Sequence, residues 1–213
     1  MHREKLAELK AWKTSTLRKP LIVRGARQVG KTWLLKEFGR ISYKQVAYIN
    51  FEESPNLKSL FLQDFSIERI ISVIEIQTQI SVTADDTLII LDEIQEAERG
   101  ITVLKYFYEN APQYHVVAAG SLLGIAFHQQ SSFPVGKVDF IDLHPMSFSE
   151  FLLALGETQL TRVLLGKDWN TLTIFRDKLN DYLKYYLFAG GLPEVVETYV
   201  QTKDWQRVRH VQA

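Results

Sequence analysis

The sequence predicts an α/β fold in which helices flank a central, mostly parallel sheet of five strands. Three observations support this class: a glycine-containing loop joins an apolar run to a helical pattern, a second apolar run ends in two acidic residues, and strand-like and helical segments alternate up to about residue 145. Residues 146–213 then show helical spacing alone. We therefore expect a sheet-containing core over residues 1–145 and a helical segment over residues 146–213.

The composition is that of a soluble globular protein. Hydrophobic residues make up 46% of the 213 residues and charged residues 23%. Lysine and arginine (25) balance aspartate and glutamate (25), so the net charge indicates neither nucleic acid nor a membrane surface as a partner. The absence of cysteine excludes disulfides, thiol catalysis and cysteine-ligated zinc. Because no apolar run has membrane-spanning length and the charged N-terminus is unlike a signal peptide, we expect a cytoplasmic protein.

The first elements surround the glycine-containing loop. Residues 3–13 alternate charged residues with leucines, which predicts a short amphipathic helix ahead of the first strand. Residues 21–23 form the apolar run of a buried strand, and the segment Gly25–Thr32 reads G-A-R-Q-V-G-K-T. This segment is a complete match to the phosphate-binding loop G-x-x-x-x-G-K-[ST]. Residues 34–38 continue as a helix, which Gly39 could end.

The chemistry of this loop is that of a phosphate site. Gly25 and Gly30 allow the backbone angles that turn successive N–H groups inward, forming a concave nest for a β-phosphate. The helix N-terminus that follows adds partial positive charge. Lys31 is expected to reach the β- and γ-phosphates, and the Thr32 hydroxyl to ligate Mg²⁺. The predicted nucleotide-binding residues are Gly25, Ala26, Arg27, Gln28, Val29, Gly30, Lys31, Thr32 and Trp33.

An acidic motif follows the third predicted strand. Residues 46–51 alternate as the second strand, residues 55–80 have the spacing of two or three helices, and residues 87–91 form the most apolar short run of the chain. Asp92 and Glu93 come directly after that run, in the pattern called Walker B. Because ligands bind outside the carboxyl ends of parallel strands, we expect Asp92 level with the loop, where it can help to hold Mg²⁺. Glu93 would orient and deprotonate the water that attacks the γ-phosphate.

The next elements complete the sheet. Residues 96–110 predict a helix and residues 115–119 a fourth strand, which runs into Ser121. This serine stands where many ATPases place a sensor of the γ-phosphate, and a helix N-cap explains a serine there equally well. Residues 135–141 alternate as a fifth strand.

The helical segment begins and breaks at recognisable signals. Ser147 and Glu150 form a capping box at the start of its first helix. Gly190 is expected to end one helix, and Pro193 to begin another. The helix over residues 182–188 carries more aromatic and apolar side chains than one face of a helix buries, so we expect part of this surface to dock on something outside these residues.

Four motifs taken together are specific: the segments Gly25–Thr32, Leu91–Gln95, Ala118–Gly124 and His144–Phe151. With them the sequence resembles the AAA-type P-loop ATPases of bacteria and archaea that carry a C-terminal domain of unknown function. The resemblance runs from about residue 12 to the end. It implies a P-loop NTPase three-layer sandwich with strand order 5-1-4-3-2, and ATP with Mg²⁺ as the ligands. The residues that it implies in the roles given above are Lys31, Thr32, Asp92, Glu93 and Ser121.

The resemblance also bears on residues outside these roles. It implies that Asn50 or Glu52, at the end of the second strand, couples Glu93 to a partner. Where the family often has Gly-Arg before the fifth strand, this chain has Gly136 and Lys137, and lysine is a poorer bidentate donor if that arginine serves as a finger. Family members are about twice this length, so the chain is expected to correspond to the ATPase half with a stub. A neighbouring subunit of a homo-oligomer, or a partner protein, would then supply an arginine finger.

Three functions agree with these motifs. The leading hypothesis is an ATP-hydrolysing switch or motor module that turns over slowly in isolation. The second is a nucleotide-dependent binding module with negligible turnover. The third, a phosphotransferase acting on a small molecule, needs an arginine-rich lid, and between residues 121 and 190 the sequence offers only Arg162 and Arg176.

Overall fold

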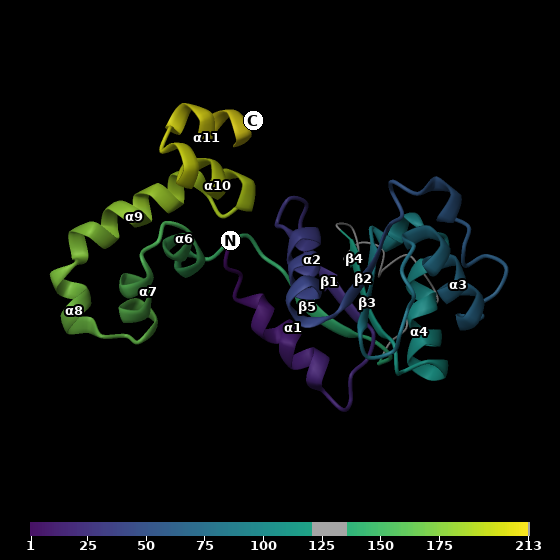
Figure 1. Ribbon diagram of the computed structural model, residues 1–213. Helices are drawn as coiled ribbons and strands as arrows, with labels where there is room; N and C mark the ends of the chain where they lie inside the picture. Colours follow the sequence, from purple (N-terminus) through teal and green to yellow (C-terminus); the bar gives the residue numbers. More distant parts are fainter. Residues whose placement is uncertain (121–135, 213) are drawn as a thin grey trace. The chain divides into compact units, whose positions relative to one another are not determined.

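The computed structural model describes residues 1–120 and 136–212 (Figure 1). The chain divides into two compact units. The sheet unit comprises Lys5–Arg27 and Lys31–Leu143. The helical unit comprises Met1–Glu4, Gln28–Gly30 and His144–Ala213. A division into two domains at residue 145 stays a prediction.

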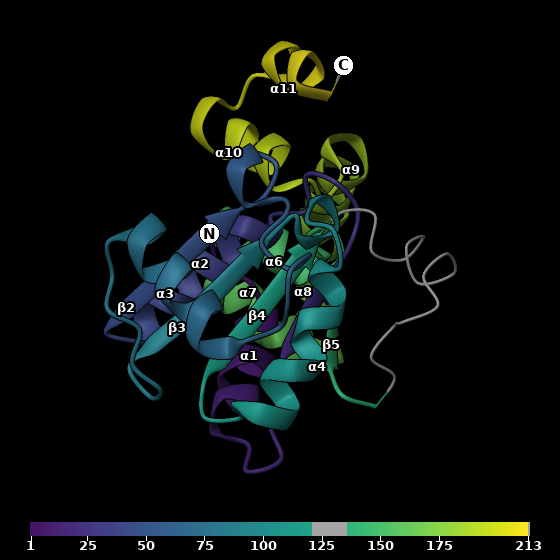
Figure 2. The same cartoon turned by 90° about the vertical axis from the view of Figure 1, so that its right-hand side faces the viewer.

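The sheet unit contains a five-stranded sheet with the order β2-β3-β4-β1-β5. Its strands are β1 (Leu21–Arg24), β2 (Gln45–Asn50), β3 (Thr87–Asp92), β4 (His115–Gly120) and β5 (Asp139–Asp142). Each neighbouring pair is parallel, and the strands lie side by side in Figure 2. This is the predicted order read from the opposite edge. The fifth strand begins at Asp139, a few residues later than the alternation predicts.

Apolar sequence explains the central position of β3 and β4. All six residues of each strand are buried, as expected for strands that helices cover on both faces. Parallel pairing also brings the carboxyl ends of the strands to one edge of the sheet. Gly25 follows β1 at that edge, and Glu93 follows β3 there.

Helices cover both faces of the sheet (Figure 1). On one face lie α1 (Lys5–Thr14) and α2 (Lys31–Ser42), and on the other lie α3 (Ile67–Thr78) and α4 (Gly100–Asn110). Every second strand residue contributes to the core under α3 and α4. The strand residues of this core are Ile22, Ala47, Ile49, Ile89, Leu91, Val116 and Ala118.

The prediction that Gly39 could end the second helix is wrong. Helix α2 continues through this glycine to Ser42. Gly39 is buried where α2 packs on the sheet, and a Cβ atom added there would lie 2.5 Å from Val46 Cγ2 and 3.4 Å from Leu88 Cδ2. The glycine therefore serves close packing of the helix on β2 and β3.

The predicted helix over residues 96–110 starts four residues too early. A single 3₁₀ turn, Ile94–Glu96, follows β3, and α4 begins only at Gly100. Arg99 has a left-handed backbone with φ 60°, which breaks any continuous helix between the two elements. A Cβ atom on Gly100 would lie 2.5 Å from the Ile94 carbonyl oxygen, so this sharp reversal requires a glycine. Residues 55–80 contain the short 3₁₀ turn Pro55–Leu57 and one α-helix, α3, where the spacing predicts two or three helices.

The helical unit is built from short helices. They are α6 (Phe148–Ala154), α7 (Thr158–Leu165), α8 (Trp169–Ile174), α9 (Arg176–Ala189), α10 (Pro193–Thr202) and α11 (Trp205–Gln212). The capping box of Ser147 and Glu150 at the start of α6 is confirmed, with both of its hydrogen bonds present. Helix α9 ends at Gly190 with φ 73°, and α10 begins with Pro193, as predicted. In the described ranges, no helix has the length and apolarity that crossing a membrane requires.

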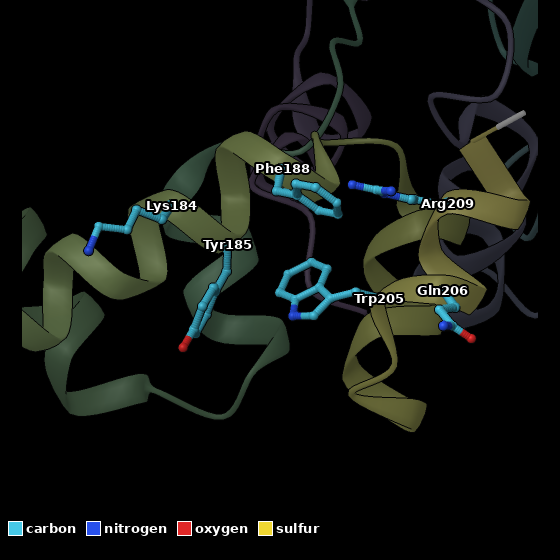
Figure 3. Close-up of a pocket in the computed structure, with 6 residues that line it drawn as sticks. All are labelled: Lys184, Tyr185, Phe188, Trp205, Gln206 and Arg209. Atoms are coloured by element: carbon cyan, nitrogen blue, oxygen red, sulfur yellow. The ribbon is translucent and has the colours of Figure 1, made fainter.

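Only part of the aromatic surface of α9 is covered within the helical unit. Tyr185 and Tyr186 pack against the apolar core of this unit, whereas Leu187 leaves 72% of its surface exposed. Phe188 and Trp205 meet edge to face, with ring centroids 4.9 Å apart. Figure 3 shows these rings lining an open pocket between α9 and α11. That this surface docks on a partner stays a prediction.

Candidate functional site

The segment between β1 and α2 has the backbone of a phosphate-binding loop. β1 ends at Arg24 and α2 begins at Lys31, so the six residues between them form the loop. Gln28 and Gly30 have positive φ angles of 64° and 87°. Alternation between left- and right-handed backbone turns successive N–H groups towards one side and makes a concave anion site. The N-terminus of α2 directly follows, where helix N–H groups lack intrahelical acceptors.

Lys31 closes over the loop from the first turn of α2. Its Nζ donates to the carbonyl oxygens of Gly25 (3.0 Å) and Ala26 (2.7 Å). The side chain is buried, and this burial lowers the pKa of Lys31 below its ordinary value, whereas the nearby carboxylates of Glu93 and Asp92 raise it. The ammonium group is thus held at the loop in a partly desolvated place, where an anionic ligand interacts with it strongly.

Asp92 joins three elements of the sheet unit. Its Oδ2 accepts hydrogen bonds from the Thr32 hydroxyl on α2 (2.6 Å) and from the Tyr48 hydroxyl on β2 (3.0 Å). Its Oδ1 accepts from the backbone N–H of Glu93 (3.1 Å). Asp92 is 1% exposed. The two residues expected to hold Mg²⁺ are therefore in direct contact, although 60 positions separate them in the sequence.

The donor set at this contact fits Mg²⁺. It consists of one hydroxyl and one carboxylate, and Mg²⁺ prefers oxygen ligands, of which proteins commonly supply one or two beside phosphate and water. The loop beside it supplies N–H groups and an ammonium for phosphate oxygens. A nucleotide with bound Mg²⁺ therefore matches the chemistry of both halves of the site.

Glu93 occupies a constrained position after β3. Its backbone is left-handed, with φ 47° and ψ 46°, a conformation uncommon for a residue with a side chain. Its carboxylate accepts a hydrogen bond from the side-chain amide of Gln95. Such strain persists only where surrounding structure holds it, and it is concentrated at functional sites. β3 ends at Asp92, and the left-handed backbone of Glu93 leads into the 3₁₀ turn Ile94–Glu96.

Two contacts at this site involve residues that the sequence analysis missed. Tyr48 lies two positions before the end of β2, and only strand pairing in register brings its hydroxyl to Asp92. Burial and the charge of Asp92 raise the pKa of Tyr48 well above its ordinary value, so it remains a donor at neutral pH. Gln95 belongs to a motif noted in the sequence, but its contact with Glu93 depends on the 3₁₀ turn. Its Oε1 is buried without a hydrogen-bond partner among the described residues.

Lys137 lies away from the loop of its own chain. It precedes β5, and Leu21 of β1 pairs with Asp139, so Lys137 lies near the start of β1, whereas Gly25 follows the other end of that strand, roughly 13 Å from Leu21 along the strand direction. Its Nζ contacts Glu109 Oε1 at 3.2 Å and lies 5.2 Å from the ring centre of Tyr108. Lys137 therefore cannot act as a finger on the phosphates bound by its own chain.

The remaining residues predicted for the site are Trp33, Asn50, Glu52 and Ser121. Trp33 is 42% exposed on α2, directly after Thr32. Asn50 is the strand partner of Asp92, and its side-chain oxygen accepts from the Glu52 backbone N–H at 3.0 Å. A coupling role for Asn50 or Glu52 stays a prediction. Ser121, the expected γ-phosphate sensor, lies outside the described residues.

The strand order and the loop that follows β1 define a nucleotide-binding protein of the P-loop ATPase class. The family model described as an AAA domain matches residues 17–152, and the chain belongs to this family. No curated protein matches the sequence.

Two solved structures are similar to the chain at low sequence identity. The Walker-type ATPase paby2304 of Pyrococcus abyssi is similar with a TM-score of 0.57 and 15% identity, over 99% of this chain and 70% of that one. A chain of Drosophila ORC bound to DNA gives a TM-score of 0.47 and 16% identity, over 98% of this chain and 64% of that one. At such identities the Pyrococcus structure shows a common fold and no more.

Proposed function

We propose that the chain binds Mg²⁺·ATP at Gly25–Thr32 and hydrolyses it to ADP and phosphate. The observation that carries this proposal is the 2.6 Å contact between Thr32 and Asp92, next to Lys31 over the loop. A hydroxyl from the first turn of α2 and a carboxylate at the end of β3, with a buried ammonium beside them, are the groups that a metal-bound triphosphate needs.

Binding is assigned to the loop and the first turn of α2. Backbone N–H groups of the loop donate to β-phosphate oxygens. Lys31 exchanges its contacts with the Gly25 and Ala26 carbonyls for contacts with the β- and γ-phosphates. Thr32 and Asp92 would hold Mg²⁺, which would neutralise phosphate charge.

Hydrolysis is assigned to Glu93. Its carboxylate takes a proton from water as the water oxygen bonds to the γ-phosphorus, and the bond between that phosphorus and the β,γ-bridging oxygen breaks. ADP carries away the electrons of the broken bond. The hydrogen bond from Gln95 supports this role because it restricts the carboxylate.

A second function, nucleotide-dependent binding with negligible turnover, is favoured by the position of Lys137. Its position near the start of β1, at the opposite end of that strand from Gly25, removes it as a source of positive charge for the γ-phosphate of its own chain. Such a charge is worth about 10³–10⁵ in rate in other phosphoryl-transfer systems. For the leading function, ATP hydrolysis, the same observation leads us to propose slow turnover by the isolated chain. Turnover would be faster when a second copy or a partner protein contributes an arginine.

Calorimetry with Mg²⁺·ATP tests the binding step. Lys31→Ala removes a charge-assisted phosphate contact, so we expect affinity to fall by several-fold to about 100-fold. Lys44→Ala is the matched control, since Lys44 is exposed and pairs with Asp86 on the surface. Equal affinity of Lys31→Ala and the unaltered chain would contradict the assignment of the phosphate loop.

Phosphate release from ATP without an added acceptor tests the reaction. A slow rate that rises with protein concentration is expected if a second copy supplies the missing charge. A rate below detection despite tight binding would favour the binding module. Release that requires a small-molecule acceptor would indicate a phosphotransferase instead.

A further inference from the structure

A buried arginine lies behind the loop, within the helical unit. Arg3 is 3% exposed, and its Nε donates to Glu150 Oε1 at 3.1 Å. Its other two nitrogens donate to backbone carbonyls, Nη1 to Val29 (2.7 Å) and Nη2 to His144 (2.7 Å). A charged group so deeply buried is stable only when paired and hydrogen-bonded, and here each guanidinium nitrogen has an acceptor.

Glu150 is held by backbone hydrogen bonds as well as by Arg3. It is 4% exposed at the start of α6. Its Oε1 also accepts from the backbone N–H of Glu4 (2.7 Å), and its Oε2 from the backbone N–H of Ser147 (3.0 Å). The carboxylate therefore has a defined position, and it fixes the position of the guanidinium group.

The contact with the Val29 carbonyl fixes the peptide group that joins Val29 to Gly30. In a planar trans peptide the C=O and the N–H point in opposite directions, and the described residues contain no cis peptide bond. A guanidinium that holds the Val29 carbonyl on one side therefore directs the Gly30 N–H to the other side. Gly30 precedes α2 and has φ 87°, the conformation that opens the phosphate nest.

We propose that Arg3, held by Glu150, is a positioning residue that aims the Gly30 N–H at the β-phosphate of a bound nucleotide. This inference rests on the proposed nucleotide site. The proposal predicts that Arg3 affects the binding of nucleotides according to their number of phosphates. ADP and ATP have a β-phosphate that accepts a hydrogen bond from the Gly30 N–H, whereas AMP has none.

Two variants of the pair separate positioning from folding. Arg3→Lys keeps the charge beside Glu150 but loses the fork that reaches two carbonyls and a carboxylate together. The double variant Arg3→Met with Glu150→Met replaces the pair by apolar side chains, a change that often preserves stability. In both we expect ADP affinity, measured by calorimetry with Mg²⁺, to fall about tenfold, while AMP affinity stays at the value of the unaltered chain.

Ser147→Ala provides the matched control. It weakens the cap of α6 without removing a contact of Arg3, so it should lower the melting temperature and leave ADP affinity unchanged. Equal ADP affinity of the folded double Met variant and the unaltered chain would overturn the inference, as would a parallel loss of AMP and ADP affinity. Failure of the unaltered chain to bind ADP would overturn the proposed function itself, and this inference with it.

Discussion

At the scale of single residues, Asp92 and Glu93 are neighbours with different surroundings. Asp92 is buried and receives hydrogen bonds from two hydroxyls, one of them from the residue that follows Lys31. Glu93 is partly exposed beyond the strand and contacts Gln95. A carboxylate enclosed by donors suits a metal shell, and one at the rim suits proton transfer with water.

This difference predicts different outcomes for two isosteric substitutions. Asp92→Asn should weaken Mg²⁺-dependent ATP binding and turnover together. Glu93→Gln should leave binding close to normal and reduce turnover by roughly 10²–10⁴, the usual contribution of a general base. Calorimetry and phosphate release measure the two effects separately. Turnover by Glu93→Gln at the unaltered rate would assign the base to another residue.

Tyr48→Phe tests the hydroxyl that the sequence analysis missed. The change removes one donor to Asp92 and keeps the ring, over which Lys36 Nζ lies 3.8 Å from the centroid. We expect the Mg²⁺ concentration that half-saturates ATP binding to rise about three- to tenfold, because the carboxylate is held less firmly. Tyr106→Phe on α4 is the control and should not change it. An unchanged Mg²⁺ requirement in Tyr48→Phe would limit this tyrosine to packing.

At the scale of elements, α2 connects the phosphate chemistry to the sheet. Its first turn supplies Lys31 and Thr32, and its last turns pack on β2 and β3 through Gly39. A bulky residue at this contact would displace the helix from the sheet and shift the N-terminal groups that the site uses.

Gly39→Val therefore should destabilise the sheet unit. The added side chain overlaps Val46, and overpacking of this kind costs about 1–3 kcal/mol. Chemical denaturation monitored by circular dichroism measures the loss. Val46→Ala in the same chain should restore part of it by making room, whereas a double variant no more stable than Gly39→Val alone would contradict this account of the packing.

The elements predicted correctly from the sequence are those determined by residues close together in the chain. A short apolar run, two glycines and a lysine predict β1, the loop and the start of α2, because each signal lies within a few residues. Gly39 was misjudged because glycine weakens an isolated helix, whereas here contact with Val46 decides its role. The bond from Tyr48 to Asp92 was missed because it depends on strand register, which no single stretch of sequence encodes.

At the scale of the whole molecule, a histidine buried in the sheet unit makes the stability of that unit depend on pH. His115 begins β4, is 5% exposed, and shares a 2.6 Å hydrogen bond with the Tyr43 hydroxyl. Burial, together with the positive charges of Arg18 and Lys13, lowers the pKa of His115 to about 4, against a smaller opposing effect of Asp85. The folded chain therefore keeps this ring neutral where the unfolded chain protonates it.

The sign of the pH dependence follows from that lowered pKa. Between pH 6.5 and about 4 the unfolded state binds the extra proton, so the free energy of unfolding should fall as pH falls, by up to about 3 kcal/mol from this group. Urea titrations of the unaltered chain and His115→Gln across this range isolate the contribution, since other groups titrate in both. Parallel pH profiles for the two chains would show that His115 has no part in the loss.

The position of β1 in the sheet has a consequence for synthesis on the ribosome. This strand is made first, yet its neighbours are β4 and β5, and β4 begins about 90 residues after β1 ends. At usual elongation rates, β1 waits roughly 5–20 s for its first partner. During that interval Leu21, Ile22 and Val23 form an apolar segment with both hydrogen-bonding edges open. Among the described strands, the one that leads into the phosphate loop therefore stays unpaired longest during synthesis.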